Sequence, residues 1–217
     1  MSDDPETVRQ IAELARDTRP LVVLDVDEVV LEFLTPFIGF LDHHGHDFRT
    51  DSFRLHGNVI DRATGTAAGQ ETVDAFLEGF FTQQEDWQIV APGAAEAMGR
   101  LGEKAEIVML TAMPHVHHGR RRALLDRAGI KAPLVTTEKA KGPAVSLLAG
   151  ERTAPVAFVD DIPYNHVSVA KHFPRAGLFH LMANKSLRPL LPALPDSVTE
   201  VADWIEAEAA IIEALSL

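Results

Sequence analysis

Leu21-Val-Val-Leu-Asp25-Val-Asp27-Glu28 is a run of four apolar residues followed by two aspartates that one residue separates. A short, uninterrupted apolar run is typical of a β-strand that is buried on both faces of a parallel sheet. Because Asp25 and Asp27 are two positions apart at the end of this strand, their side chains can lean toward the same side. The stretch therefore predicts a parallel sheet with paired carboxylates at its carboxyl edge.

Further short apolar segments alternate with helical patterns along the chain. The expected strands are Ile107 to Leu110, Leu134 to Thr136, Val156 to Val159 and Leu178 to Leu181. Helical periodicity or capping signals predict helices from Asp4-Pro5 to Arg19-Pro20, around Ala94 to Leu101, from Gly119 to Gly129, from Gly142 to Gly150, and from a capping box at Ser197 and Glu200 onward. This alternation predicts a doubly wound, Rossmann-like α/β core with helices on both faces of a parallel sheet.

The segment from Phe33 to about Asp86 departs from this alternation. A helix start at Thr35-Pro36 and an apolar stripe from Val73 to Phe81 predict helices, and no run resembles a core strand. Of the 11 phenylalanines, 8 lie in this region. We expect a small inserted helical cap at residues 33–85 and a core at residues 1–32 and 86–217. Most of these phenylalanines should pack within the cap, and one or two should face a substrate.

Composition and charge exclude several classes of function. The 217 residues contain no cysteine, which excludes a disulfide framework, a thiolate metal site and a cysteine nucleophile. The formal net charge of −12 argues against binding of a nucleic-acid polymer. Apolar runs of only a few residues predict no membrane span, and Met1-Ser2-Asp3 does not resemble a signal peptide. We expect a cytoplasmic protein; no pattern indicates its oligomeric state.

Chemically useful residues cluster at the ends of the expected strands. Thr111 follows the second strand of the core and Asp160-Asp161 follows the fourth, while Lys139 and Lys141 lie just before a helix. Ligands of open parallel sheets bind outside the carboxyl ends of the strands, so these residues should converge with Asp25 and Asp27.

The converging residues suit a metal and a phosphate. Four crowded carboxylates repel one another, and Mg²⁺ is the usual cation that relieves such repulsion beside phosphate. Thr111 can donate a hydrogen bond to a phosphoryl oxygen, and a lysine can supply positive charge. We prefer Lys141 to Lys139 because glycine follows Lys141 and the helix begins there.

These segments resemble the four motifs of the haloacid dehalogenase superfamily, in order and in strand context. The motifs are Leu21 to Val29, Ile107 to Thr111, Lys141-Gly142 and Val156 to Asp161. Leu34 to Leu41, Phe80-Phe81 and Ala91 to Ala94 resemble, over part of the cap only, the 5′(3′)-deoxyribonucleotidase branch. The resemblance implies a core of that fold with the first strand placed centrally, and a helical cap of the first type inserted after the first motif.

The resemblance also implies roles for individual residues. Asp25 would be the nucleophile that forms an aspartyl-phosphate, and Asp27 the general acid and base. Thr111 and Lys141 would hold the phosphoryl group. Asp25, the backbone carbonyl of Asp27, Asp161 and the nearby Asp160 would surround Mg²⁺. The reaction implied is the hydrolysis of a small phosphate ester, possibly a nucleotide, by a phosphoric monoester hydrolase.

Two alternatives use the same residues. A phosphotransferase or phosphomutase needs the same paired aspartates, and a non-catalytic binding protein could retain an inherited fold. Glu28 keeps the second alternative open, because the superfamily usually has a small residue after the second aspartate. A large acidic side chain there could lower anion affinity or reshape the approach from the cap.

Several polar residues can be explained by a structural role as well as by a functional one. We expect the histidines of the two clusters, at 43–46 and 115–118, to be exposed in loops, although His115 or His117 could touch substrate. Arg120 to Arg122 are expected to form a charged helix face rather than a second anion site. Asn165 and Asn184 lie near strand ends, where they could orient other groups.

Overall fold

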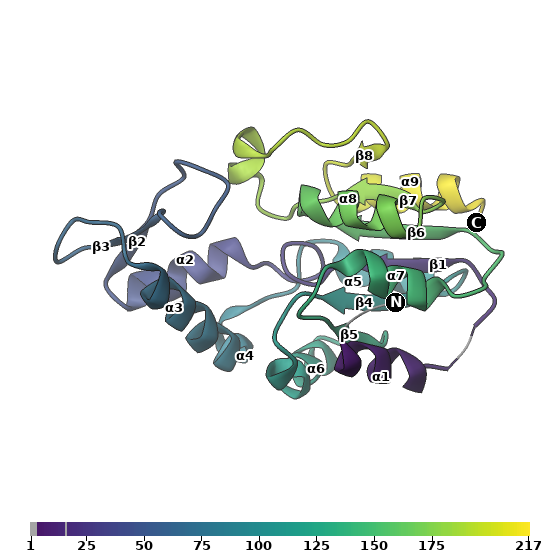
Figure 1. The fold of residues 1–217 in the computed structure, drawn as a ribbon, viewed down its shortest axis with the longest axis horizontal. Coiled ribbons are helices and arrows are strands. Elements are labelled where there is room, and N and C mark those ends of the chain that lie inside the picture. Colours follow the sequence, from purple (N-terminus) through teal and green to yellow (C-terminus); the bar gives the residue numbers. More distant parts are fainter. Residues whose placement is uncertain (1–3, 16) are drawn as a thin grey trace.

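The computed structural model describes residues 4–15 and 17–217, which leaves the predicted features at Met1-Ser2-Asp3 outside the described residues. A six-stranded parallel sheet has the order β5-β4-β1-β6-β7-β8 (Figure 1). Its strands are β1 (Leu21–Leu24), β4 (Glu106–Thr111), β5 (Leu134–Thr136), β6 (Val156–Asp160), β7 (Gly177–His180) and β8 (Val198–Glu200). The five predicted strands are confirmed, and β1 lies inside the sheet between β4 and β6.

Successive side chains of each strand pack against helices on opposite faces of the sheet. Val22 and Leu24 of β1 join one apolar cluster with helices α5, α6 and α9, whereas Leu21 and Val23 join a second cluster with α1, α7 and α8. The core helices are α1 (Pro5–Glu13), α5 (Ala94–Gly102), α6 (His118–Arg127), α7 (Lys141–Ala149), α8 (Pro163–His172) and α9 (Trp204–Leu215), with short 3-10 turns η1 (His115–His117) and η2 (Lys185–Leu190). The predicted doubly wound α/β architecture is therefore confirmed.

The last helix begins later than the sequence pattern predicts. Val198 and Thr199 belong to β8, which pairs in parallel with β7, and α9 starts at Trp204. Asp203 caps α9, since its carboxylate accepts hydrogen bonds from the amides of Ile205 and Glu206. The prediction of a capping box at Ser197 and Glu200 was wrong, because pairing with the exposed edge of β7 outweighed the local signal. The first helix likewise ends at Glu13, before Arg19-Pro20.

The cap is a separate layer at the left of Figure 1, packed around its own aromatic cluster. It comprises α2 (Leu34–His43), the hairpin strands β2 (His46–Phe48) and β3 (Val59–Asp61), and α3 (Gln70–Thr82), while α4 (Gln84–Trp87) leads back to the core. Phe37, Phe40 and Phe80 are buried in this cluster. The antiparallel pair β2–β3 was not predicted, because its strands are only three residues long and lie in a polar, glycine-containing segment.

The two connections between the cap and the core lie side by side. Leu31 forms an antiparallel bridge with Val90, the Glu32 amide donates to the Ile89 carbonyl at 2.9 Å, and the Ala91 amide donates to Val30 at 2.9 Å. The chain thus leaves and re-enters the core at one point, just beyond β1.

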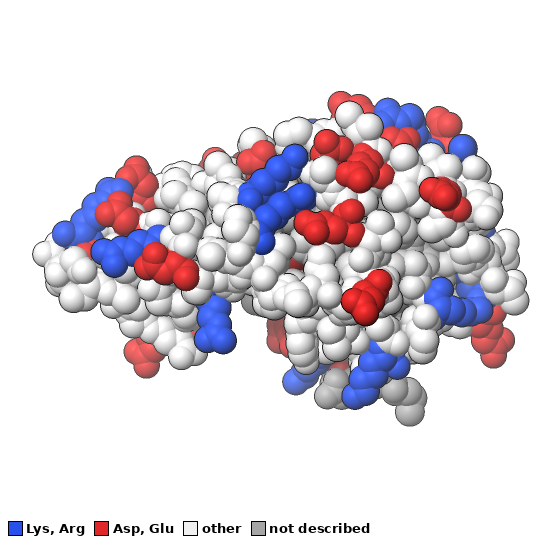
Figure 2. All heavy atoms as spheres, turned by 90° about the horizontal axis from the view of Figure 1, so that it is seen from above, with Lys and Arg blue, Asp and Glu red and all other residues white. Residues whose placement is uncertain are grey.

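Charges of both signs are interspersed on the face of the molecule shown in Figure 2. Figure 2 shows Lys and Arg next to Asp and Glu at the cap end and over the core, with no continuous basic area on this face. Within residues 4–15 and 17–217, no helix combines the length and apolar character that a membrane span requires.

Gly142 lets the third motif approach helix α8 closely. A Cβ atom added at Gly142 would lie 2.2 Å from the Ser168 carbonyl oxygen, which is backbone and cannot turn aside. We expect Gly142→Ala to lower the free energy of unfolding by about 2 kcal/mol or more, because overpacking forces the two helices apart. Urea denaturation measures this loss.

Gly99 of α5 offers the matched control. A Cβ atom there meets nothing within 4 Å, so Gly99→Ala should leave stability unchanged or raise it by about 0.5–1 kcal/mol through helix propensity. Equal midpoints for Gly142→Ala and the unmodified protein would show that α7 and α8 do not pack as described.

Candidate active site

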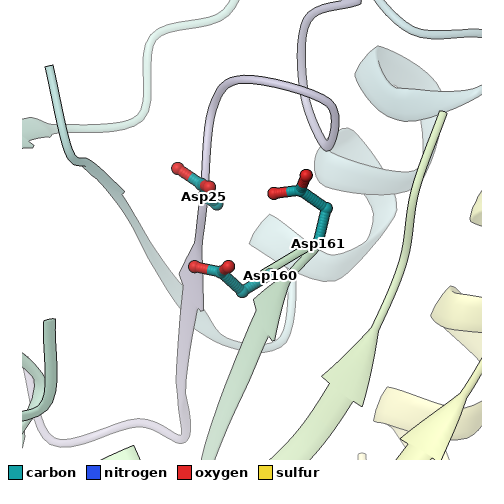
Figure 3. Close-up of side chains that lie close together, drawn as sticks. All are labelled: Asp25, Asp160 and Asp161. Atoms are coloured by element: carbon teal, nitrogen blue, oxygen red, sulfur yellow. The ribbon is translucent and has the colours of Figure 1, made fainter. Parts of the chain in front are cut away.

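Three buried aspartates converge at the carboxyl edge of the sheet. Asp25 follows β1, Asp160 ends β6 and Asp161 comes next, and one carboxylate oxygen of each lies within 4.8 Å of the others. Figure 3 shows the three carboxylates pointing toward one another from two adjacent strands. Parallel pairing of β1 with β6 fixes this meeting, because the Asp25 amide continues the ladder to the Val159 carbonyl at 2.9 Å.

Lys141 supplies a cation to this acidic cluster. Its ammonium Nζ lies 2.6 Å from Asp25 Oδ1 and 2.7 Å from Asp160 Oδ2, and the side chain is buried at the start of α7. Burial disfavours the charged form, but attraction to Asp160 and Asp25 outweighs it and raises the pKa of Lys141 above its usual value. The structure thus brings Lys141 to the aspartates, whereas Lys139 is exposed.

One lysine does not balance three buried carboxylates. Burial, assisted by repulsion from Asp160 and opposed by Lys141, raises the pKa of Asp25 to about 7. Burial and the neighbouring carboxylates Asp160 and Asp25 also raise the pKa of Asp161 well above its usual value. Oxygen ligands at this spacing, with unbalanced negative charge, fit a hard divalent cation such as Mg²⁺.

Other side chains hold the acidic loop in place. Asn165 donates to both oxygens of Asp160 at 2.9 and 3.1 Å, and the Ile162 amide donates to Asp160 Oδ1 at 2.8 Å. Two buried histidines bind the loop backbone, His166 at the Asp160 carbonyl (3.0 Å) and His180 at the Asp161 carbonyl (2.9 Å). Burial lowers the pKa of both histidines, which favours neutral rings that donate through Nε2.

Asp27 has a different set of partners from those of Asp25. Its carboxylate accepts hydrogen bonds from Gln88 Nε2 at 2.8 Å and Thr111 Oγ1 at 3.4 Å. Arg121 contacts both oxygens of Asp27 at 3.1 Å. The Asp27 side chain keeps 21% of its surface exposed, so water can reach it.

Arg121 is fully buried and links Asp27 to the segment that returns from the cap. Its guanidinium also donates to the side-chain oxygens of Gln84 and Gln88 and lies 5.8 Å from the Phe81 ring centroid. The prediction that Arg120 to Arg122 form a charged helix face was wrong for Arg121, which is buried. A helical signal was present, since Arg121 shares a face with the buried Leu124 and Leu125, three and four positions later.

Glu28 turns away from the acidic cluster and binds backbone amides. Its backbone has a φ of +64°, a region that favours glycine. One carboxylate oxygen accepts the amides of Phe33 and Leu34 at 2.9 and 2.5 Å, and the other accepts the Asn184 amide at 2.8 Å. Burial nevertheless raises the pKa of Glu28. Glu28 therefore caps helix α2, which has no capping side chain of its own, and ties it to the loop after β7.

The histidines have structural partners. His117 is buried against Glu78 of the cap at 3.0 Å, so the expectation that it would be exposed was wrong. His115 bridges Thr136 Oγ1 at 2.6 Å and Asp4 Oδ1 at 3.0 Å. Asp4, besides capping α1, thus helps to fix the loop that follows Thr111.

A cavity of about 380 Å³ lies at the other edge of the sheet, where the parallel strands begin. Its wall includes Arg19, Lys131 and the first residues of β4, Glu106 and Ile107, and no cluster of metal-binding side chains among the described residues. The carboxyl edge of the sheet therefore remains the candidate active site.

Comparison with solved structures identifies proteins of similar fold. A haloacid dehalogenase-like family hydrolase from Xanthomonas campestris aligns over 93% of this chain and 98% of its own, with a TM-score of 0.58 and 12% identity. A haloacid dehalogenase-like family hydrolase from Streptococcus pneumoniae aligns over 89% and 99%, with a TM-score of 0.57 and 9% identity. A protein described as a predicted phosphatase from Clostridium acetobutylicum aligns over 91% of this chain and 100% of its own, with a TM-score of 0.56 and 12% identity.

The chain therefore has the fold of the haloacid dehalogenase-like hydrolases, because nearly the whole of both chains is matched. No protein-family model and no curated protein sequence matches the chain.

Proposed function

We propose that this protein is a Mg²⁺-dependent phosphatase that hydrolyses a small phosphate monoester through an aspartyl-phosphate on Asp25. The proposal is carried by the contact of Asp25 with the Lys141 ammonium at 2.6 Å, within 4.8 Å of the carboxylate oxygens of Asp160 and Asp161. Such a nucleophile lies between a cation that can hold phosphate and carboxylates that can hold a metal. The descriptions of the structural neighbours as hydrolases and phosphatases support the same chemistry.

Asp25, Asp161, Asp160 and the Asp27 backbone carbonyl would hold the metal. Bound Mg²⁺ would neutralise charge on the phosphoryl oxygens and on the attacking carboxylate. Burial and repulsion between the carboxylates raise the pKa values of Asp25 and Asp161, and a bound cation would offset both effects.

The chain's own residues would perform two successive displacements at phosphorus. Asp25 attacks phosphorus while the bond to the ester oxygen breaks, and Asp27 gives its proton to that oxygen. Asp27 then takes a proton from water, whose oxygen attacks phosphorus and releases Asp25. Thr111 and Lys141 would bind the phosphoryl oxygens during both steps. The partial exposure of Asp27 allows water to reach it as the acceptor.

Release of inorganic phosphate tests the proposal. A panel of p-nitrophenyl phosphate, nucleoside monophosphates and sugar phosphates should show hydrolysis with Mg²⁺ and none with EDTA. A protein that is silent on every member in the presence of Mg²⁺ would instead favour a binding role on this fold.

A further inference from the structure

The buried guanidinium of Arg121 pairs with Asp27, and the proposed mechanism gives it no part. Its Nη1 donates to Asp27 Oδ2 at 3.1 Å, and its Nη2 lies 3.1 Å from Asp27 Oδ1. Burial of a charge is costly even when the charge is paired, and apolar side chains in place of a buried ion pair often stabilise a protein. The stability of the fold alone therefore does not account for an arginine at this position.

Two glutamines fix the orientation of the guanidinium. Gln84 Oε1 accepts from Nε of Arg121, and Gln88 Oε1 accepts from Nη2 at 3.0 Å. The amide nitrogen of Gln88 donates to Asp27 Oδ1 at 2.8 Å and to the Glu32 carbonyl at 3.0 Å. Because every nitrogen of the guanidinium has a partner and Gln88 binds through both ends of its amide, neither side chain is free to turn.

This network joins three segments of the chain at Asp27. Arg121 lies on core helix α6, Gln84 begins α4 and Gln88 follows it, and Glu32 belongs to the segment that leads into the cap. Both connections between cap and core thus meet α6 at the carboxylate of Asp27. The position of that carboxylate is set by the way the cap is attached, as well as by the loop after β1.

Arg121 cannot itself bind a substrate. None of its side-chain surface is exposed, and its three nitrogens are occupied by Asp27, Gln84 and Gln88. Asp27, in contrast, keeps 21% of its side-chain surface exposed, so substrate and water can reach it. Any effect of Arg121 on the reaction must therefore pass through Asp27.

Building on the proposed phosphatase activity, we propose that Arg121 is the positioning residue of Asp27, and that it holds the carboxyl group where it gives a proton to the ester oxygen and later takes one from water. Each carboxylate oxygen has two lone pairs, so one oxygen can carry the proton while the other stays hydrogen-bonded. Without the guanidinium, the Asp27 side chain can rotate away from the ester oxygen. A displacement of about 1 Å in a catalytic group can lower a rate about 10²-fold.

The test replaces Arg121 with methionine and compares two esters of similar size. The benzyl oxygen leaves as a strong base and needs a proton, whereas p-nitrophenolate is a weak base and leaves without one. We expect Arg121→Met to lower kcat for benzyl phosphate about 10²-fold with KM nearly unchanged, because Arg121 does not touch substrate. The first-turnover release of p-nitrophenolate should fall less than about threefold.

The second step gives an independent readout. Hydrolysis of the aspartyl-phosphate needs Asp27 to take a proton from water, whichever ester formed it. Arg121→Met should therefore release p-nitrophenolate in a rapid burst close to the enzyme concentration, then turn over slowly while the phosphoryl-enzyme accumulates. A loss of folded protein lowers the burst and the steady rate together, so it does not imitate this pattern.

Two further variants serve as controls. Arg120→Met makes the same change one position earlier, at an arginine that is 52% exposed and pairs with Glu85 of α4 at 3.2 Å, and it should alter neither ester's rate. Gln84→Met removes a partner of Arg121 without touching Asp27. It should show the same pattern as Arg121→Met with a smaller loss, about tenfold on benzyl phosphate, and it carries the test if Arg121→Met does not fold.

The outcomes separate this inference from the proposed function. If folded Arg121→Met keeps its kcat on benzyl phosphate, or loses rate equally on both esters without a burst, the positioning role is overturned while the phosphatase remains. Unchanged rates in Gln84→Met beside an unfolded Arg121→Met also overturn it. Where only p-nitrophenyl phosphate is hydrolysed, the burst decides. If the unmodified protein hydrolyses neither ester with Mg²⁺, the proposed function fails and the inference fails with it.

Discussion

Replacing Asp25 with asparagine is expected to lower the rate of phosphate release by at least about 10³-fold, because the amide cannot form the aspartyl-phosphate. The variant should remain folded. Burial and repulsion from Asp160 raise the pKa of Asp25, so its charge is unfavourable in the native state and its removal relieves that cost. We expect an unchanged or higher unfolding temperature, because Lys141 keeps its contact with Asp160 at 2.7 Å.

The matched control is Asp196→Asn, which makes the same change in an exposed loop before β8. Its rate should equal that of the unmodified protein. After a brief reaction, mass spectrometry should detect a labile phosphoryl group on the unmodified protein and on Asp196→Asn, but not on Asp25→Asn. If Asp25→Asn kept its activity, Asp25 would not be the nucleophile and the proposed route would be wrong.

Magnesium is expected to stabilise the protein, and more so at pH 8 than at pH 5.5. The pKa of Asp25 is raised from 3.8 to about 7 in the folded chain. Between these values the native protein holds a proton that the unfolded chain has released, so stability without metal falls as pH rises through this window. At pH 8 the Asp25 carboxylate is ionised and can bind the cation. Saturation at a hundred times Kd should raise the unfolding temperature by about 5–10 °C.

Thermal unfolding with Mg²⁺ and with EDTA at both pH values measures this effect. Asp161→Asn supplies the control, since it removes one of the three clustered carboxylates. It should show a smaller response to Mg²⁺ and a higher unfolding temperature in EDTA. Identical unfolding temperatures with and without Mg²⁺ at pH 8 would mean that the cluster holds no such cation.

The sequence predicted the central sheet well because its signals are strong and local. Four-residue apolar runs such as Leu21 to Leu24 have few alternatives to a buried strand, and parallel pairing then forces Asp25, Asp160 and Asp161 to one edge. The roles assigned to Asp25, Asp27, Thr111 and Lys141 stay predictions, although the structure places Lys141 against Asp25 and Thr111 against Asp27.

The features that sequence reasoning missed depend on contacts between distant segments. Arg121 binds Asp27, which lies 94 positions earlier in the sequence. Glu28 binds Asn184, which lies 156 positions later. Neither distance leaves a local pattern, and a charged residue is ordinarily read as exposed because burial without a partner is costly. The strand β8 was missed because it is only three residues long and carries no apolar run, so that its pairing with β7 alone defines it.

The paired connections at Leu31 and Val90 have a consequence for divergence. Because the chain crosses to the cap and back through two hydrogen-bonded neighbours, the inserted segment is grafted at a single junction, and its length can change without shifting the register of β1. A replacement segment would have to supply a partner for Arg121 in place of Gln84, a partner for the buried His117 in place of Glu78, and two amides for Glu28.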